Sequence, residues 1–208
     1  SILVQVIKDA IGTKGARLST QISLAGRLLV FLPQESHIGI SQRIEDDSER
    51  ELLRDKLQQI LPAEEKGGYI IRTMAETADE SDLRADLEYL HRLWHDIQQK
   101  SMTIAAPVLL YQDLDLSHRV LRDFVDEDTI RILVDSRENY QRLVRFAHNY
   151  MTYIAERITL YTGDRPLFDL YSVEEEIEKS LAKRVNLKSG GYLIIDQTEA
   201  LTTMDVNT

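Results

Sequence analysis

Residues 188–208 read KSGGYLIIDQTEALTTMDVNT. The Ser189–Gly191 triplet predicts a hairpin turn. Asp205 and Asn207 stand near the end of the β-like run that closes this stretch. Because residues i and i+2 of a strand point to the same face, these two side chains would present oxygen atoms side by side. Such a pair suits a hard cation such as Mg²⁺, which takes few protein ligands and keeps several waters. The same spacing is common at strand ends and turns, so on spacing alone the pair is more often an ordinary strand end.

The composition limits the class of protein. A chain of 208 residues with 43% apolar residues can form the core of one large or two small domains. It contains no cysteine, which excludes disulfides and a thiolate zinc site. No apolar run approaches the roughly 18 residues of a membrane span, and no signal peptide opens the chain, so we expect a cytoplasmic protein without a membrane span. The chain starts at Ser1 in a strand-like segment, and we expect it to be a fragment.

The net charge of −10 argues at first sight against a nucleic-acid partner, since phosphate contacts need Lys and Arg. The charge is unevenly distributed: residues 1–43 carry five basic and two acidic side chains, a balance of +3, which leaves −13 for residues 44–208. A basic leading segment could form an RNA-facing patch, or it could be an uneven solvated surface.

Strand-like and helix-like segments alternate along the chain, which predicts an α/β or mixed α+β fold. The clearest helix follows Ser81, which we expect to be its N-cap, and its apolar stripe consists of Leu83, Leu87, Leu90, Trp94 and Ile97. An earlier helix is expected to be capped by Ser48, with Glu51 completing a capping box. Residues 108–111 are expected to form a strand after Pro107.

The sequence of residues 188–208 resembles the active-site segment of the ribonuclease E/G family, and other segments match that family in the same order. The resemblance implies four parts: the end of an S1 (OB-type) barrel at residues 1–20, a 5′-sensor region at 21–115, a ribonuclease-H-like subdomain at 116–180, and the start of a DNase-I-like catalytic subdomain at 181–208. The segments that carry it are 4–18, 23–33, 39–45, 68–73, 121–124, 161–163 and 188–208.

The resemblance also implies roles for individual residues. A 5′-monophosphate pocket carries over to Gly26, Val30, Arg72 and Thr73. A phosphate dianion is well matched by a guanidinium fork, a hydroxyl and closely approaching backbone N–H groups, which a glycine would permit. Adjacent strand residues point to opposite faces, so Arg72 and Thr73 can converge only if the strand ends or bends there.

In the catalytic segment, the resemblance makes Asp205 the Mg²⁺ ligand and Asn207 the amide that helps to orient it. The family's second catalytic aspartate and its zinc-binding cysteines have no counterpart in this chain, so zinc belongs to the family's full-length proteins only. With one carboxylate, we expect this chain alone to be inactive. Lys14 and Arg17 could contact RNA beside the S1 barrel, but solvated loop residues explain them equally well.

The function implied by the resemblance is Mg²⁺-dependent endonucleolytic cleavage of single-stranded RNA with sensing of the 5′-monophosphate. It further implies roles in ribosomal RNA maturation and mRNA turnover, and a homo-oligomeric full-length protein. The alternative from a different class is a non-catalytic module that binds RNA 5′ ends or a protein partner. The sequence does not identify the particular RNA substrates.

Overall fold

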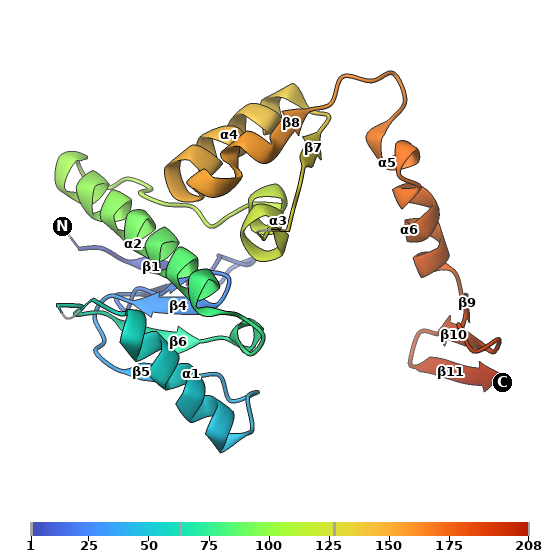
Figure 1. Cartoon of the computed structure of the whole chain (residues 1–208), viewed down its shortest axis with the longest axis horizontal. Helices are drawn as coiled ribbons and strands as arrows, with labels where there is room; N and C mark the ends of the chain where they lie inside the picture. The colour runs from blue at the N-terminus through green and yellow to red at the C-terminus, as the bar shows by residue number, and fades with distance from the viewer. Residues whose placement is uncertain (1, 63, 127, 208) are drawn as a thin grey trace. The chain divides into compact units, whose positions relative to one another are not determined.

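The structure is a computed structural model that describes residues 2–62, 64–126 and 128–207. Its fold is mixed α/β, with several small sheets (Figure 1). The chain divides into two compact units: Ser1–Ile132 with Glu138–Ile158, and Leu133–Arg137 with Thr159–Thr208. This division follows contacts between residues and leaves the four-part assignment from the sequence as a prediction.

The first unit is built around a four-stranded sheet with the order β3-β4-β6-β5, in which only the β5–β6 pair is parallel. A separate β1–β2 ribbon precedes it, and two 3-10 helices, η1 and η2, follow β6 and α4. The elements are β1 (Gln5–Lys8), β2 (Arg17–Ser19), β3 (Leu24–Ala25), β4 (Leu29–Leu32), β5 (Ile38–Ile40), α1 (Asp47–Ile60), β6 (Gly68–Ile71), η1 (Thr73–Ala75), α2 (Glu80–Thr103), α3 (Leu116–Phe124), α4 (Arg137–Tyr150) and η2 (Thr152–Arg157).

The second unit contains two short helices and a three-stranded antiparallel sheet with the order β11-β10-β9. Its elements are α5 (Leu167–Leu170), α6 (Val173–Leu181), β9 (Arg184–Asn186), β10 (Tyr192–Gln197) and β11 (Thr202–Asn207). Strands β7 (Ile132–Val134) and β8 (Ile158–Leu160) pair as a two-stranded sheet where the chain passes between the units.

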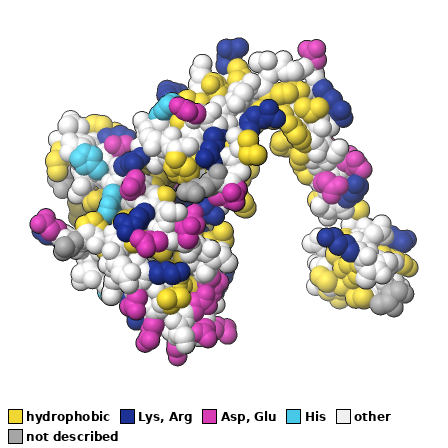
Figure 2. Space-filling model, viewed as in Figure 1, with side chains coloured by type: hydrophobic (Ala, Val, Ile, Leu, Met, Phe, Trp, Pro, Cys, Tyr) yellow, Lys and Arg dark blue, Asp and Glu magenta, His cyan; other side chains and the backbone are white. Residues whose placement is uncertain are grey.

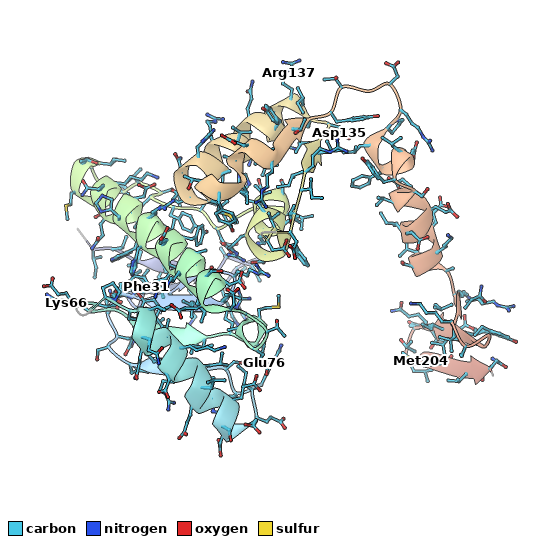
Figure 3. The ribbon with its side chains drawn as sticks, in the orientation of Figure 1. Phe31, Lys66, Glu76, Asp135, Arg137 and Met204 are labelled. Carbon is cyan, nitrogen blue, oxygen red and sulfur yellow. The ribbon has the colours of Figure 1, made fainter. Side chains whose placement is uncertain are left out.

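One face of the four-stranded sheet forms the core with α1 and α2. Strand alternation places Leu29 and Phe31 of β4 on this face, and both are buried. Phe31, which Figure 3 labels, packs edge-on against Trp94 of α2, with ring centroids 6.4 Å apart. The predicted apolar stripe of α2 is confirmed for Leu83, Leu87, Leu90 and Ile97, which are buried, while Trp94 is half-buried.

Both predicted helix caps were wrong by two residues. Helix α2 is capped by Asp79, whose carboxylate accepts the N–H of Asp82 at 2.9 Å, while the Ser81 hydroxyl donates to Asp79. Helix α1 is capped by Asp46 and not by Ser48. In each case an aspartate two positions earlier reaches the third N–H of the helix, which an N-cap must satisfy.

The strand predicted at residues 108–111 is not formed. The segment has no strand partner, and Leu109 is 73% exposed. An apolar run becomes a strand only when another edge accepts its backbone hydrogen bonds.

The surface carries the excess negative charge unevenly. Acidic side chains gather over α1 and the residues before it, in the lower part of Figure 2, where exposed carboxylates include Asp46, Asp47, Glu51 and Asp55. None of the helices in the described ranges combines the length and apolar character of a membrane span.

A buried carboxylate joins α2 to the sheet. Asp86 is 7% exposed, and its oxygens accept the backbone N–H groups of Arg27 (2.7 Å), Leu28 (2.9 Å) and Leu29 (2.8 Å) in the turn between β3 and β4. Burial raises the pKa of the Asp86 carboxyl, and the three N–H donors oppose that rise. The carboxylate therefore satisfies a set of backbone donors that would otherwise be buried without partners.

We expect Asp86→Ala to lower the free energy of unfolding of the chain by about 3 kcal/mol or more, because each buried N–H left unpaired costs about 1–3 kcal/mol. Urea denaturation followed by Trp94 fluorescence measures the change. Glu88→Ala is the matched control on α2: this exposed carboxylate forms only a surface pair with Arg92, and its loss should cost about 0.5 kcal/mol or less. Equal effects of the two substitutions would contradict the role of Asp86.

Candidate functional site

The β3–β4 turn brings together two of the residues predicted to bind a 5′-phosphate. The Nη1 of Arg72 donates hydrogen bonds to the carbonyl oxygens of Gly26 and Arg27, the latter at 3.2 Å. The backbone N–H of Arg72 donates to the carbonyl of Leu28 at 2.8 Å. Arg72 is thus fixed against the turn by both its backbone and its side chain.

Of the other two predicted residues, Val30 lies on β4 and Thr73 lies just beyond the end of β6. Val30 of β4 is opposite Ile70 of β6 in the antiparallel register, and Arg72 follows Ile70 by two residues. Strand β6 ends at Ile71, Arg72 is extended, and Thr73 begins the 3-10 helix η1. The strand therefore ends before Thr73, which is the condition under which Arg72 and Thr73 can converge, and the two residues are not held on opposite faces of one strand.

The space next to Gly26 is taken by Asp86. A Cβ at position 26 would lie 2.5 Å from both carboxylate oxygens of Asp86, which is closer than side-chain atoms can approach. The close approach that this glycine permits in the structure is therefore that of a protein carboxylate. Arg72 still has donors for a ligand: within the described residues, only its Nη1 forms hydrogen bonds, leaving Nε and Nη2.

Arg122 of α3 reinforces the same turn from another element. Its Nη1 donates to the carbonyl of Ala25 at 2.9 Å, while its Nε and Nη2 form a two-pronged pair with Asp123. This buried arginine was not recognised as a site residue from the sequence, and neither was Asp86. The available signal for Asp86 was a carboxylate in the apolar stripe of α2, three residues after Leu83.

Lys14 and Arg17, the weaker RNA-binding candidates, are both exposed. Lys14 forms an isolated backbone bridge with Ile11, and Arg17 lies opposite Lys8 in the β1–β2 ribbon. Their side chains are accessible to a ligand, as are the apolar side chains of Ile7, Ile11 and Leu18 around them.

Asp205 and Asn207 lie on one face of β11, as the strand spacing predicts. In the register, Asp205 is opposite Ile194 and Asn207 is opposite Tyr192. The Nδ2 of Asn207 donates to Oδ2 of Asp205 at 3.0 Å, and the carboxylate is exposed. Met204, which Figure 3 labels on this sheet, alternates with Asp205 and belongs to the opposite face.

The turn that leads into this sheet is the predicted one. Gly190 adopts a φ of +95°, a region that side-chain-bearing residues rarely occupy, and its N–H donates to the carbonyl of Leu187 at 3.1 Å. The turn sets the pairing of β9 with β10, and β10 in turn aligns β11.

The donor set at Asp205 fits a magnesium ion that keeps most of its waters. The exposed carboxylate offers hard oxygen atoms, and the amide of Asn207 restricts its rotation. In the described part of the chain, no three His, Cys, Asp or Glu side chains cluster as a ready-made metal site. Asp196, the next carboxylate on this face, is paired with Lys183 at 2.6 Å, and that hydrogen bond raises the pKa of the Lys183 ammonium.

Comparison with known proteins supports the sequence resemblance. The model of the "Ribonuclease E/G family" matches residues 23–208. The chain belongs to the ribonuclease E/G family. Ribonuclease G of Escherichia coli (strain K12) is 49% identical over 207 residues, and ribonuclease G of Haemophilus influenzae is 45% identical over 207 residues. Ribonuclease E of Nostoc sp. is 40% identical over 209 residues.

These comparisons cover nearly all of this chain but less than half of the relatives. The chain is matched over 100% of its length by both ribonuclease G proteins and spans 42% of theirs. It is matched over 99% of its length by the Nostoc ribonuclease E and spans 30% of that protein.

The contact between Gly26 and Asp86 generates a test by double substitution. We expect Gly26→Ala to destabilise the chain by about 1–3 kcal/mol, because the added methyl group collides with the Asp86 carboxylate. In an Asp86→Ala background the same change should cost clearly less, giving a coupling of about 1 kcal/mol or more in urea denaturation. Additive effects would show that the glycine is required for some other reason.

Proposed function

We propose that this chain is part of a Mg²⁺-dependent endoribonuclease that cuts single-stranded RNA and senses a 5′-monophosphate. The observation that carries the proposal is the exposed Asp205–Asn207 pair on one face of β11, in a chain of the ribonuclease E/G family. A Mg²⁺ ion would be held by Asp205, and when bound it would supply an acidified water and offset charge on the phosphoryl oxygens.

The contribution of the protein at this site is orientation. The amide of Asn207 holds one oxygen of Asp205, so the other oxygen keeps a defined direction without an internal partner in the described residues. The ion pair with Lys183 engages Asp196, so Asp205 is the carboxylate left open on this face. The Asp205 carboxylate, which would hold the metal, therefore takes no part in the neighbouring Lys183–Asp196 ion pair.

The 5′ end of the RNA would bind at the β3–β4 turn. Arg72 would offer Nε and Nη2, Thr73 a hydroxyl and Val30 an apolar wall for the terminal nucleotide. Gly26 would contribute by admitting the Asp86 carboxylate that fixes the turn. Asp86 would not contact the phosphate, because three backbone N–H groups already surround it. Its role would be to fix the turn in one conformation, so that RNA binding does not lose conformational entropy in ordering the site.

The wider assignments follow from the family. We propose a cytoplasmic protein that acts in ribosomal RNA maturation and mRNA turnover and is homo-oligomeric at full length. Zinc would belong to parts of the full-length relatives outside this chain.

A non-catalytic module that binds RNA 5′ ends is the second candidate. It is favoured by one observation: a single open carboxylate is a weak Mg²⁺ site, whereas the turn offers a guanidinium with two unused donor atoms. A cleavage assay of the full-length protein separates the two functions, because only the enzyme shortens an RNA that both would bind.

In the full-length protein we expect Asp205→Asn to lower the rate of RNA cleavage on the order of 10²-fold or more, because it removes the charge that holds the metal. Gel assays with a short single-stranded RNA and saturating Mg²⁺ measure the rate, and RNA binding should be little changed. Asp196→Asn is the control on the same face. The 208-residue chain alone is expected to be inactive. Cleavage by the Asp205→Asn protein at the unaltered rate would remove Asp205 from the mechanism.

We also expect Arg72→Gln to slow cleavage of 5′-monophosphorylated RNA roughly 10- to 100-fold, the effect of losing one charge-assisted interaction of about 1.5–3 kcal/mol. A matched RNA with a 5′-hydroxyl should be cleaved at nearly the original rate, because it has no phosphate for the pocket. Since Arg72 also holds the turn, unfolding would slow both substrates. Equal losses on both RNAs would return Arg72 to a purely structural role.

A further inference from the structure

The face of the three-stranded sheet that carries Asp205 also carries an arginine stacked on a tyrosine. The Cζ of Arg184 lies 3.8 Å from the ring centroid of Tyr192, a cation–π geometry. The Nε of Arg184 donates to Oδ1 of Asn186 at 3.2 Å. The guanidinium is therefore held in place by a ring and by an amide while remaining exposed to solvent.

The strand register aligns this arginine with Asp205. Arg184 of β9 is opposite Ile194 of β10, and Ile194 is opposite Asp205 of β11. The three residues form one row across the sheet, and their side chains share a face. With neighbouring strands about 4.8 Å apart, the backbones of Arg184 and Asp205 are separated by about 10 Å. The adjacent row consists of Asn186, Tyr192 and Asn207.

Arg184 keeps most of its hydrogen-bonding capacity. Within the described residues, Nη1 and Nη2 have no acceptor and no carboxylate forms an ion pair with this side chain. Lys183 and Lys179 differ, because Lys183 is paired with Asp196 and Lys179 with two glutamates. Arg184 is thus an oriented cation that is not neutralised by the protein itself.

We propose that Arg184, held on Tyr192, binds a phosphate of the RNA strand whose cleavage site lies at Asp205. A planar guanidinium with two free N–H edges matches phosphate oxygens, and its fixed orientation reduces the entropy lost on binding. Arg184 acts as a positioning residue: it places the strand across Ile194 toward the carboxylate and does not itself take part in bond breaking. This inference rests on the proposed ribonuclease function.

RNA binding by the 208-residue chain tests the contact without cleavage. The probe is a fluorescent single-stranded RNA with a 5′-hydroxyl, and its dissociation constant is measured by anisotropy over a range of salt concentrations without Mg²⁺. We expect Arg184→Gln to weaken binding roughly tenfold at low salt, as for one charge-assisted contact. The slope of log Kd against log salt should shrink by about 0.7, the value for one phosphate contact on a single strand.

Two further variants make the result specific. Lys188→Gln removes the same charge from the β9–β10 turn and should leave the affinity and the salt slope near their original values. Tyr192→Leu keeps the charge of Arg184 but removes its platform, so binding should weaken several-fold with the slope retained. If Arg184→Gln unfolds the sheet, Tyr192→Leu still tests whether the stacked Arg184 binds RNA. Unaltered binding by Tyr192→Leu, or equal effects of Arg184→Gln and Lys188→Gln, would overturn the proposal.

Kinetics of the full-length protein separate this inference from the proposed function. We expect Arg184→Gln to raise KM on 5′-hydroxyl and 5′-monophosphate RNA alike, with kcat nearly unchanged, because the residue binds the strand and not its end. A drop in kcat with unaltered KM would overturn the positioning role. Failure of the ribonuclease proposal itself would show differently, as RNA binding by the full-length protein without cleavage.

Discussion

The carboxylate of Asp86 determines the geometry of the first unit's candidate site. It lies on α2 yet accepts three backbone N–H groups of the β3–β4 turn, so the helix and the sheet are joined by hydrogen bonds as well as by apolar packing. Gly26 has no side chain because the carboxylate fills that space. With the turn fixed, its carbonyl groups point to Arg72 and Arg122. Arg72 is thus linked, through the turn, to a buried carboxyl group on another element.

Local rules predicted the elements better than their ends. The apolar stripe of α2 and the turn at Ser189–Gly191 were confirmed because side-chain periodicity and glycine conformation act over a few residues. The caps of α1 and α2 were wrong because several Ser and Asp residues near each start could have served. The strand expected at residues 108–111 failed because a strand depends on a partner that no local pattern specifies.

The candidate sites likewise combine features that local sequence predicts with features that depend on tertiary packing. The pairing of Asp205 with Asn207 followed from strand alternation alone, whereas the end of β6 at Ile71 was only a condition for Arg72 and Thr73 to converge. The contacts of Asp86 span 57 to 59 residues of sequence, and the row that joins Arg184 to Asp205 requires the register of three strands. Such relations arise from tertiary packing, and residue spacing does not contain them.

The central claim is that the Asp86-anchored turn presents a site for a 5′-phosphate. Amide chemical shifts of the ¹⁵N-labelled 208-residue chain, titrated with a short 5′-monophosphorylated RNA and with its 5′-hydroxyl counterpart, test it most directly. The account predicts that the monophosphate alone shifts the amides of Gly26, Val30, Arg72 and Thr73, with the shifts saturating together. Identical shifts with both RNAs, or shifts confined to residues outside the turn, would contradict it.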